Sequence, residues 1–555
     1  MVRILNLLIV ILEVVSLSKT FKSRGLKKNF VFYTQLSNMM TFFASLFLVI
    51  FGLKDWVEAL RFLSVSMLVM TFFVTACILA PWSHKAKELL FSGSGLYHHT
   101  IIPILSTLTY MLFEKRAPFH WIWLPGLMTL IYGLVMLYFN YIDVVDGPYP
   151  FFKIKQQGVK ATVLWMVGLF AAVTAFSALV GYHKPSKTDI KYIYVHGLSG
   201  WGSYDVQYEY FPYWGMFGGD VIRYMNEQGY ESYAASVDPS GSAWDRACEL
   251  YAQLTGTRVD YGKAHSESAG HARFGRDYSS EPLVKDLSDS RYVLIGHSFG
   301  GATIRLFSEI IRNGAAEEID STDPADLSPF FKGGAGENLL AVVTLAAPTN
   351  GTTSYDLHED SSFDLSKIEI PKKYEKSNER MKHSTGAKAN DGRAEWDYAS
   401  YDMHIDNALA INERITTFED VYYFAYPCDS TMIAKNGELV PDPAITENMF
   451  MKSSIYACKY TGTTAGGFRV DESWQPNDGL VNTVSAKAPI GAPSVEYTED
   501  QLAGDARATV NFAPGIWNVM PTRRGDHMSL QGGMFKRVKV KDFYLELAKM
   551  LAALE

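Results

Sequence analysis

The chain has 555 residues, with 51 lysines and arginines against 59 aspartates and glutamates, which gives a formal net charge of −8. This acidic balance, without a basic patch interleaved with aromatic residues, argues against nucleic acid as a partner. The length is large for one domain, and a mean hydropathy near zero conceals two unlike halves that meet near residue 185.

The half before residue 185 contains repeated apolar runs of the length that a helix needs to cross a bilayer. We predict an all-α domain of six transmembrane helices, over about residues 2–17, 31–53, 62–81, 98–113, 119–141 and 161–181. The first run has a signal peptide as its alternative, but Arg3 is its only early cation and no small-residue cleavage pattern follows. A soluble helical domain is disfavoured because soluble cores rarely need so many charge-poor runs.

Loop cations predict the orientation of these helices. An even number of spans leaves both termini on one side of the membrane. Cations in the loops facing one side slightly outnumber those facing the other, and they are Lys19, Lys22, Arg24, Lys27, Lys28, Lys85, Lys87, Lys153, Lys155 and Lys160. By the positive-inside rule these loops are cytoplasmic, so we expect the C-terminal half to be extracytoplasmic.

The second half alternates short β-rich runs with helical patterns and contains no further spanning segment. We therefore predict a membrane domain over residues 1–185 and a soluble α/β domain over residues 186–555. The four cysteines, Cys77, Cys248, Cys428 and Cys458, show no Cys-x-x-Cys spacing. A disulfide from Cys458 to Cys248 or Cys428 is one option, and isolated buried thiols are favoured.

A short strand is predicted at the start of the second half, over residues 192–195, and it ends in His196-Gly197-Leu198. In enzymes that use a serine nucleophile on a parallel sheet, a His-Gly turn at this place supplies a backbone N–H to the oxyanion hole. We expect the Leu198 N–H to be such a donor. A simple strand-ending turn is the alternative.

Gly296-His297-Ser298-Phe299-Gly300 is the motif with the clearest chemistry. It follows the β-rich run 292–295 and precedes helical spacing over residues 300–309, which is the setting of a nucleophile elbow. The two glycines let the backbone pass through a strained bend. The motif predicts Ser298 as the nucleophile of a hydrolase, with the Phe299 N–H as the second oxyanion donor. An ordinary turn is the alternative in a chain with 43 glycines.

A serine nucleophile needs an acid and then a base further along the chain. His527 lies in a loop before a closing amphipathic helix over residues 541–554, and the other histidines after Ser298 are His358, His383 and His404. Asp478 lies in a turn-type loop, residues 476–481, which suits a carboxylate that aims at an imidazole. Spacing alone leaves a surface-loop role equally open for Asp478 and His527.

Longer strings in the second half resemble a known family. They cover residues 196–202, 244–254, 259–265, 270–276, 345–352, 477–485 and 515–518. These strings resemble the large zinc-containing lipases of thermophilic bacilli and, more distantly, the staphylococcal lipases, over most of residues 190–550. The resemblance implies an α/β-hydrolase fold. By matching motifs it also implies a Ser298–Asp478–His527 triad that cleaves carboxylic esters through an acyl-enzyme.

The same resemblance implies a metal site in an insertion of the hydrolase domain. The residues that match the family's zinc ligands are Asp245, His265, His271 and Asp402. Two imidazoles and two carboxylates close a tetrahedral shell, and a closed shell is typical of structural zinc.

Three differences from the family bear on cofactors and substrate. Phe299 stands where the family has a glutamine, so the backbone donor is kept and side-chain polarity is lost. The family's calcium ligands are an acidic pair, and here these positions are Ser529 and Met534, so calcium is not expected. Residues 363–400, where the family carries its lid, look shorter and lack an amphipathic pattern, which favours shorter or membrane-borne esters.

Short strings in the first half resemble a second family. They lie around Thr34, around His98 and His99, and at residues 147–152. They resemble the six-helix androgen-inducible membrane proteins, whose members include threonine hydrolases of fatty acid esters of hydroxy fatty acids. The resemblance implies a site at Thr34 with one of the two histidines, and which of them matches is open. Histidines at the headgroup level are the alternative.

The leading expectation is a membrane-anchored serine ester hydrolase, a lipase or carboxylesterase, that acts on lipid-derived esters beside a bilayer. One alternative is a threonine-type lipid ester hydrolase within the membrane half. Another is a membrane scaffold with an inactive hydrolase domain, against which the complete triad argues. The sequence predicts no oligomeric state.

Overall fold

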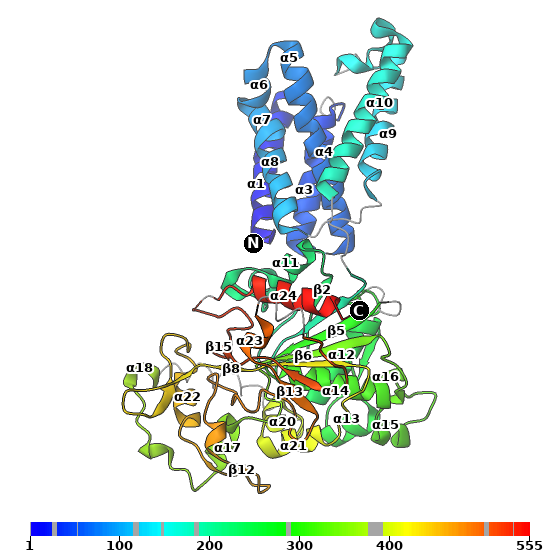
Figure 1. Ribbon diagram of the computed structural model, residues 1–555. Helices are drawn as coiled ribbons and strands as arrows, with labels where there is room; N and C mark the ends of the chain where they lie inside the picture. The colour runs from blue at the N-terminus through cyan, green and yellow to red at the C-terminus, as the bar shows by residue number, and fades with distance from the viewer. Residues whose placement is uncertain are drawn as a thin grey trace. The chain divides into compact units, whose positions relative to one another are not determined.

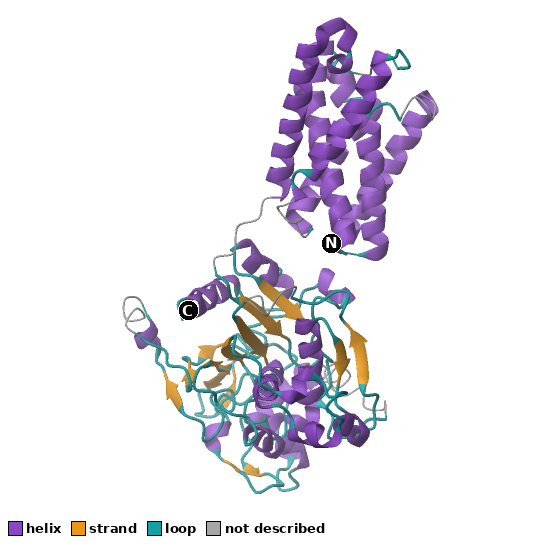
Figure 2. Cartoon of the chain, turned by 90° about the vertical axis from the view of Figure 1, so that its right-hand side faces the viewer, coloured by secondary structure: helices purple, strands orange, loops and turns teal. Residues whose placement is uncertain are grey.

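The computed structural model describes residues 2–24, 30–52, 54–114, 121–145, 149–181, 188–284, 290–375, 392–503, 510–536 and 538–554. The chain divides into two compact units, Met1–Lys184 and Pro185–Glu555 (Figure 1). The first unit is helical, and the second combines helices with strands (Figure 2).

Long helices build the first unit: α1 (Val2–Arg24), α3 (Tyr33–Phe51), α4 (Asp55–Phe73), α9 (Leu124–Tyr141) and α10 (Ile154–Gly181). Shorter ones lie between them: η1 (Val74–Leu79), α5 (Ala80–Ser83), α6 (Ala86–Leu90), α7 (Gly93–Leu96), η2 (Tyr97–Ile101), α8 (Ile102–Phe113) and η4 (Pro150–Phe152). Among the described residues, five helices are long and apolar enough to cross a membrane. The further predicted span, residues 98–113, falls on the π-helical η2 and on α8, which is only 12 residues long.

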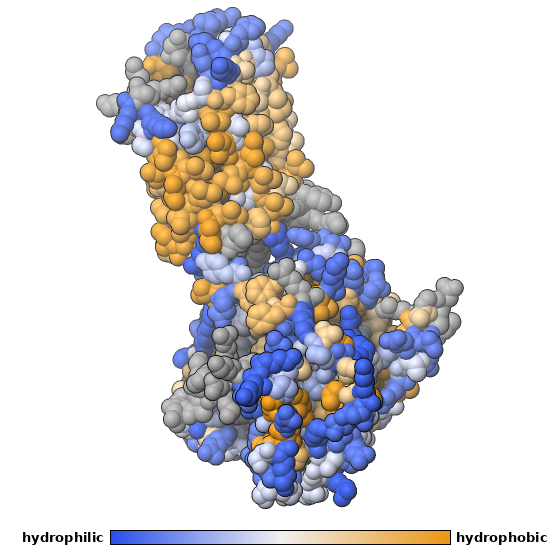
Figure 3. All heavy atoms as spheres, turned by 90° about the vertical axis from the view of Figure 1, so that its left-hand side faces the viewer, coloured by the Kyte–Doolittle hydropathy of each residue, from blue (hydrophilic) through white to orange (hydrophobic). Residues whose placement is uncertain are grey.

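The first unit has an apolar exterior and a polar interior. On α1 the exposed face carries Ile4, Leu7, Ile11 and Val14, whereas Asn6, Glu13, Ser16 and Thr20 are buried. Figure 3 shows hydrophobic side chains gathered over the helices of this unit. A fully buried ion pair, Arg61 Nη2 to Glu114 Oε1 at 2.9 Å, lies inside it. This distribution is typical of helices surrounded by lipid, because apolar side chains face the hydrocarbon and polar groups pair with one another inside.

A seven-stranded parallel sheet in the order β13-β14-β7-β6-β5-β1-β2 forms the centre of the second unit. Its strands are β1 (Lys191–Val195), β2 (Ser232–Ala235), β5 (Tyr292–His297), β6 (Leu339–Leu345), β7 (Tyr422–Tyr426), β13 (Ser494–Glu496) and β14 (Trp517–Val519). β5 and β6 are buried along their whole length because helices cover both faces of the sheet.

Alternate residues of the strands face two separate cores. One face packs against α12 (Ala243–Thr255) and α14 (Gly300–Asn313), through residues such as Leu250 and Ile304. The other packs against α11 (Val221–Glu227) and α24 (Lys541–Ala552), through residues such as Met225 and Leu547. This layering places the carboxyl ends of the parallel strands, and the loops that follow them, along one edge of the sheet.

The remaining elements of the second unit are short. The helices are η5 (Val206–Glu209), η6 (Met216–Gly218), α13 (Lys263–Ala269), α15 (Ala316–Ser321), α16 (Pro329–Lys332), α17 (Thr353–Glu359), η7 (Leu365–Lys367), α18 (Lys372–Glu375), α20 (Ala399–Asp402), α21 (Ile405–Asn412), α22 (Met451–Ala457), η8 (Glu472–Trp474) and α23 (Glu499–Leu502). The strands are β3 (Arg258–Asp260), β4 (Phe274–Asp277), β8 (Cys428–Asp429), β9 (Thr431–Ile433), β10 (Leu439–Pro441), β11 (Gly462–Thr463), β12 (Arg469–Val470) and β15 (Arg523–Arg524).

The cysteines and the predicted lid segment can now be compared with the expectations from the sequence. All four cysteines are free thiols, so the disulfide option is wrong; Cys77 is exposed and the other three are buried. In the predicted lid segment, residues 363–400, the described part holds only the short elements η7, α18 and the start of α20. Residues 376–391, with the candidate base His383, lie outside the described residues.

Candidate active site

Ser298 lies in a tight turn between the end of β5 and the start of α14. Its φ of 55° is in the left-handed region, which is uncommon for a residue other than glycine and typical of strained functional turns. The flanking glycines are required by space: a Cβ on Gly296 would lie 2.4 Å from the Gly300 oxygen, and one on Gly300 would lie 2.2 Å from the Val195 oxygen. The turn therefore presents Ser298 at the edge of the sheet where the strands end.

Three side chains form a continuous hydrogen-bonded row at this turn. Ser298 Oγ lies 2.8 Å from His527 Nε2, and His527 Nδ1 lies 2.9 Å from Asp478 Oδ2. The His527 N–H also donates to the Asp478 carbonyl oxygen at 2.8 Å. Asp478 Oδ1 accepts the N–H groups of Leu480 and Val481 at 3.0 and 2.8 Å. The carboxylate is thus held in place beside His527 Nδ1, and the other ring nitrogen, Nε2, faces Ser298.

The turn after β1 is anchored on both sides of the Gly197 peptide. Arg246 donates from Nη2 to the His196 carbonyl oxygen, and the Gly197 N–H donates to the Tyr213 hydroxyl at 3.1 Å. The N–H groups of Leu198 and Phe299 make no hydrogen bond with any described residue. Two unengaged N–H groups beside Ser298 are therefore available as hydrogen-bond donors to a bound group.

Phe299 enters the site through its backbone only. Its side chain is fully buried and packs with Ala243, Ala399 and Met403. The guanidinium of Arg246 lies 5.2 Å from the centre of its ring. The aromatic side chain therefore belongs to the packing under α12, which explains why the position tolerates a large apolar residue.

Sequence reasoning missed two residues beside the row. His297 Nδ1 lies 2.7 Å from the Tyr213 hydroxyl, and His297 Nε2 lies 2.8 Å from the carbonyl oxygen of His527. Burial lowers the pKa of His297 to about 3, so the ring is neutral. The position of His297 within the motif was a signal, whereas nothing in the sequence distinguishes Tyr213.

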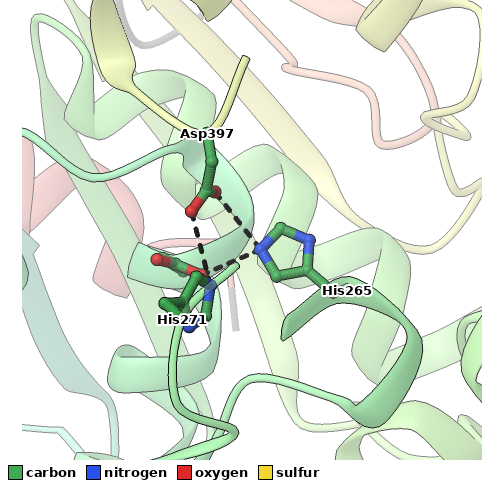
Figure 4. Close-up of side chains that lie close together, drawn as sticks. His265, His271 and Asp397 are labelled. Carbon is green, nitrogen blue, oxygen red and sulfur yellow. Dashed lines mark hydrogen bonds and ion pairs between the residues drawn. The ribbon is translucent and has the colours of Figure 1, made fainter. Parts of the chain in front are cut away.

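Four side chains of the kinds that bind metal ions lie together in the second unit, and they are Asp245, His265, His271 and Asp397. Figure 4 labels the last three. One ligand atom from each lies within 4.8 Å of all the others. His265 Nε2 is 3.1 Å from Asp245 Oδ1 and 3.2 Å from Asp397 Oδ1. His271 Nε2 is 3.3 Å from Asp397 Oδ2.

Asp402, the fourth ligand that the sequence resemblance implied, is not a member of this group, and Asp397 occupies its place. Asp397 precedes α20 and faces the two histidines, whereas Asp402 ends α20, and its Oδ2 accepts the N–H of Ala243 at 2.8 Å. Asp402 therefore holds the first turn of α12, where N–H groups lack partners within the helix. Asp397 and Asp402 lie five positions apart in the same short segment, and the sequence match fell on the second of them.

The group fits a metal ion by its donor set and by its unsatisfied atoms. His271 Nε2 and Asp397 Oδ2 are buried and lie 3.3 Å apart, but the two atoms form no hydrogen bond with each other or with another described residue. Arg393 Nη1 lies 3.2 Å from Asp245 Oδ2 and supports that carboxylate from outside the group. Two imidazole nitrogens and two carboxylate oxygens are a common ligand set for zinc, and buried polar atoms without partners are costly unless an ion binds them.

The family's calcium positions have a different chemistry in this chain. Ser529 Oγ hydrogen-bonds Asp526, and Met534 packs beside an apolar cluster. Nearby, the Lys536 ammonium donates to the carbonyl oxygens of Pro443 and Thr446, each at 2.6 Å. The loop that carries His527 is thereby tied to the loop before α22 by a lysine.

Replacing Lys536 with methionine is expected to lower the free energy of unfolding by about 2 kcal/mol, because two carbonyl groups lose a charged donor. The measurement is the thermal unfolding of the second unit in the full chain, where we expect a melting temperature several degrees lower. Lys435→Met, at an exposed turn, is the control and should leave the melting temperature unchanged. Equal melting temperatures for the two variants would show that the Lys536 contacts contribute nothing.

Of the candidate residues in the first unit, Thr34 and His98 lie close to each other, whereas His99 has other neighbours. The Thr34 carbonyl oxygen accepts Asn38 Nδ2 at 2.7 Å, and the same nitrogen lies 3.4 Å from the His98 oxygen. His98 Nε2 contacts Ser16 Oγ and Thr20 Oγ1, each at 2.9 Å. His99 instead contacts the Leu89 oxygen at 2.7 Å. Of the two histidines, His98 has its backbone near that of Thr34, whereas the His98 ring contacts Ser16 and Thr20.

Thr34 also lines a cavity in the first unit. Most of the wall is apolar, with Met70, Val74, Phe152 and Leu169, and further hydroxyl groups come from residues such as Thr71, Thr75 and Tyr132. A mostly apolar cavity with a few polar groups suits a ligand with a long apolar portion.

A parallel sheet with a serine in a strand-to-helix turn is an arrangement typical of α/β-hydrolases, and comparisons with known proteins find similarity to lipases. Residues 188–370 match the family model for the lipase-like C-terminal domain. Lipase 1 of Staphylococcus aureus is 31% identical over 392 residues, which cover 65% of this chain and 54% of that lipase. The chain thus spans about half the length of the curated relatives that it matches.

Solved structures give the same result. EstA from Clostridium botulinum has a TM-score of 0.55 at 28% identity, covering 68% of this chain and 90% of that chain. The Staphylococcus hyicus lipase has a TM-score of 0.54 at 27% identity, covering 67% of this chain and 97% of that chain. The second unit is thus similar in sequence and in fold to lipases of the staphylococcal type.

Proposed function

We propose that the protein is a membrane-anchored serine ester hydrolase whose nucleophile is Ser298, whose base is His527 and whose acid is Asp478. The observation that carries this proposal is the hydrogen-bonded row from Asp478 through His527 to Ser298, at a strained turn between β5 and α14. Few other functions require a serine, a histidine and a buried carboxylate in that order and geometry.

The chemistry follows from these contacts. His527 Nε2 accepts the Ser298 proton as Oγ attacks the ester carbonyl, and Asp478 stabilises the imidazolium that forms. The N–H groups of Leu198 and Phe299 stabilise the tetrahedral oxyanion. His527 then protonates the departing alcohol, which leaves an acyl group on Ser298. Water, activated by His527, releases the acid and restores the serine.

A structural zinc ion is part of the proposal for the second unit. Its ligands are Asp245, His265, His271 and Asp397, which come from α12, from α13 and its following turn, and from the segment before α20. When bound, the ion neutralises two buried carboxylates and ties these segments together. No step at Ser298 involves this group.

The first unit is proposed to be a six-helix transmembrane domain over residues 1–185, with the hydrolase domain over residues 186–555 outside the cytoplasm. Support comes from the five long apolar helices, from the apolar exterior with polar residues inside, and from the loop cations. Alkaline carbonate extraction tests the anchoring: the chain should stay in the membrane pellet, and its release into the supernatant would refute integral insertion.

Lipid-derived carboxylic esters are the proposed substrates. The described part of the lid segment offers only short helices to cover the site, which favours acyl chains of short or medium length. The full chain in detergent should therefore hydrolyse chromogenic esters, with kcat/KM highest at short or medium acyl lengths. A steady rise in kcat/KM up to the longest chains would refute this substrate class, and a complete lack of hydrolysis would refute the enzyme.

A second candidate activity is a threonine-type lipid ester hydrolase in the first unit. It is favoured by the position of Thr34 on an apolar cavity, with the backbone of His98 nearby, where the Asn38 amide bridges the Thr34 and His98 carbonyl oxygens. Thr34→Ala and Ser298→Ala, compared on the same lipid esters, separate the two candidates. Loss of hydrolysis in the Thr34 variant alone would assign the activity to the first unit.

A further inference from the structure

The Tyr213 hydroxyl lies between the two loops that the proposed mechanism must hold in register. On one side it is 3.1 Å from the N–H of Gly197, in the turn that presents the Leu198 donor. On the other side it is 2.7 Å from His297 Nδ1, and His297 Nε2 is 2.8 Å from the carbonyl oxygen of His527. A single buried hydrogen-bonded chain therefore joins the oxyanion turn to the catalytic histidine loop.

The donor and the acceptor of every hydrogen bond in this series can be assigned. The His527 carbonyl only accepts, so His297 Nε2 carries the proton of the neutral ring and Nδ1 is an acceptor. The Tyr213 O–H must then donate to His297 Nδ1, which leaves its oxygen to accept the Gly197 N–H. Each of these donors and acceptors is therefore paired once within this hydrogen-bonded series of described residues.

Displacement of this turn would act directly on the nucleophile. Gly197 lies against Ser298, and a Cβ on Gly197 would meet Ser298 Cβ at 2.6 Å. The opposite side of the turn is held by Arg246 at the His196 oxygen, while the Gly197 N–H depends on Tyr213. Tyr213 and His297 are 4% and 1% exposed, so bulk water does not replace a missing partner there.

We propose that Tyr213 is a positioning residue that couples the oxyanion turn to the His527 loop, so that the Leu198 N–H and the His527 imidazole are both held at Ser298. This inference rests on the proposed function of Ser298. Tyr213 touches no reacting atom, and its effect is to keep two parts of the transition-state site at a fixed separation.

Tyr213→Phe in the full chain tests the proposal, because phenylalanine keeps the ring and removes only the hydroxyl. We expect kcat for a soluble ester to fall about tenfold or more, with KM unchanged within about twofold. The inhibition constant of a boronic acid, which forms a tetrahedral adduct on the serine, should rise by the same factor as kcat falls. This pattern reports loss of transition-state binding, which a merely structural role would not produce.

Tyr423→Phe is the matched control. Tyr423 is also buried, and its hydroxyl likewise accepts a backbone N–H, from Phe418 at 3.0 Å, but it lies on β7 outside the described contacts of the site. We expect a lower melting temperature with unchanged kcat. If Tyr213→Phe behaves in the same way, the positioning role is refuted.

His297→Asn provides a second test of the proposal if Tyr213→Phe does not fold. Asparagine offers Tyr213 an acceptor near the place of Nδ1 but does not reach the His527 carbonyl, so the coupling is cut on the other side. We again expect lower kcat at constant KM, and a normal kcat would overturn the proposal. Ser298→Ala distinguishes failure of this inference from failure of the proposed function. If hydrolysis survives in Ser298→Ala, the proposed function is refuted. If hydrolysis is lost in Ser298→Ala but kept in both Tyr213→Phe and His297→Asn, only the role of Tyr213 is refuted.

Discussion

Ser298→Ala is expected to lower kcat for ester hydrolysis by about 10⁴-fold or more, while the melting temperature stays the same. Without Oγ no acyl-enzyme forms, and the residual rate comes from the Leu198 and Phe299 N–H groups alone. Alanine has the same backbone constraints as serine, so the φ of 55° at this position is no harder to adopt. The measurement is steady-state hydrolysis of a soluble chromogenic ester by the full chain.

Ser308→Ala is the matched control for this variant. Ser308 is buried on α14, the helix that follows the turn, and its hydroxyl donates to the Arg305 carbonyl oxygen at 2.7 Å. This substitution should leave kcat within about twofold of the original value, because only a local helix bond is lost. If Ser298→Ala retained similar activity, the serine mechanism would be wrong.

Asp397→Asn is expected to remove stoichiometric zinc and to lower the melting temperature of the second unit by about 10 °C, equivalent to roughly 5 kcal/mol. The substitution removes one of the two carboxylates that neutralise the ion and leaves Asp245 with two imidazoles, a weaker ligand set. Metal analysis by mass spectrometry and thermal unfolding, each with and without a chelator, provide the readouts. In the original chain the chelator should reproduce the shift seen in the variant.

Asp402→Asn is the control that separates the two aspartates. It weakens the hydrogen bond to the Ala243 N–H, so we expect a loss of about 1 kcal/mol with zinc still bound at one ion per chain. The opposite result, zinc lost from the Asp402 variant and retained in the Asp397 variant, would restore the original assignment. A chain that holds no zinc, and whose melting temperature is insensitive to chelation, would exclude the structural ion.

The features that sequence predicted well depend on local patterns. The strand, the turn at Ser298 and the helix after it lie within about twenty residues, and glycine requirements and hydrophobic periodicity determine them over that range. The strand before Gly197 and the closing helix are of the same kind, and β1, β5, α14 and α24 correspond to them.

Features that sequence missed depend on contacts between distant segments. The choice between Asp397 and Asp402 depends on how the segment around α20 packs against α12 and α13, which a match of sequence motifs does not report. Tyr213 reaches His297 across 84 positions, so no local pattern identifies it. Phe299 was expected to change the polarity of the site, but its ring is buried under α12, because the turn sends its side chain into the core.

Residues 98–113 agree with the predicted span only in part. They fall on η2 and α8, which continue from α7 without a break in the helix, but this run is not among the five described helices that are long and apolar enough to cross a membrane. The π-helical stretch changes the hydrogen-bonding pattern inside the helix, and hydropathy averaged over a window does not report such a change.

Mapping the acyl group in an acid-quenched reaction tests the proposed catalytic centre most directly. The full chain is mixed with a chromogenic ester, stopped in acid during the first turnover and digested, and the modified peptide is identified by mass spectrometry. We predict an acyl group on Ser298, absent from the His527→Ala variant because the base is missing. An acyl group on Thr34, or an unmodified Ser298 in an actively hydrolysing sample, would contradict the assignment.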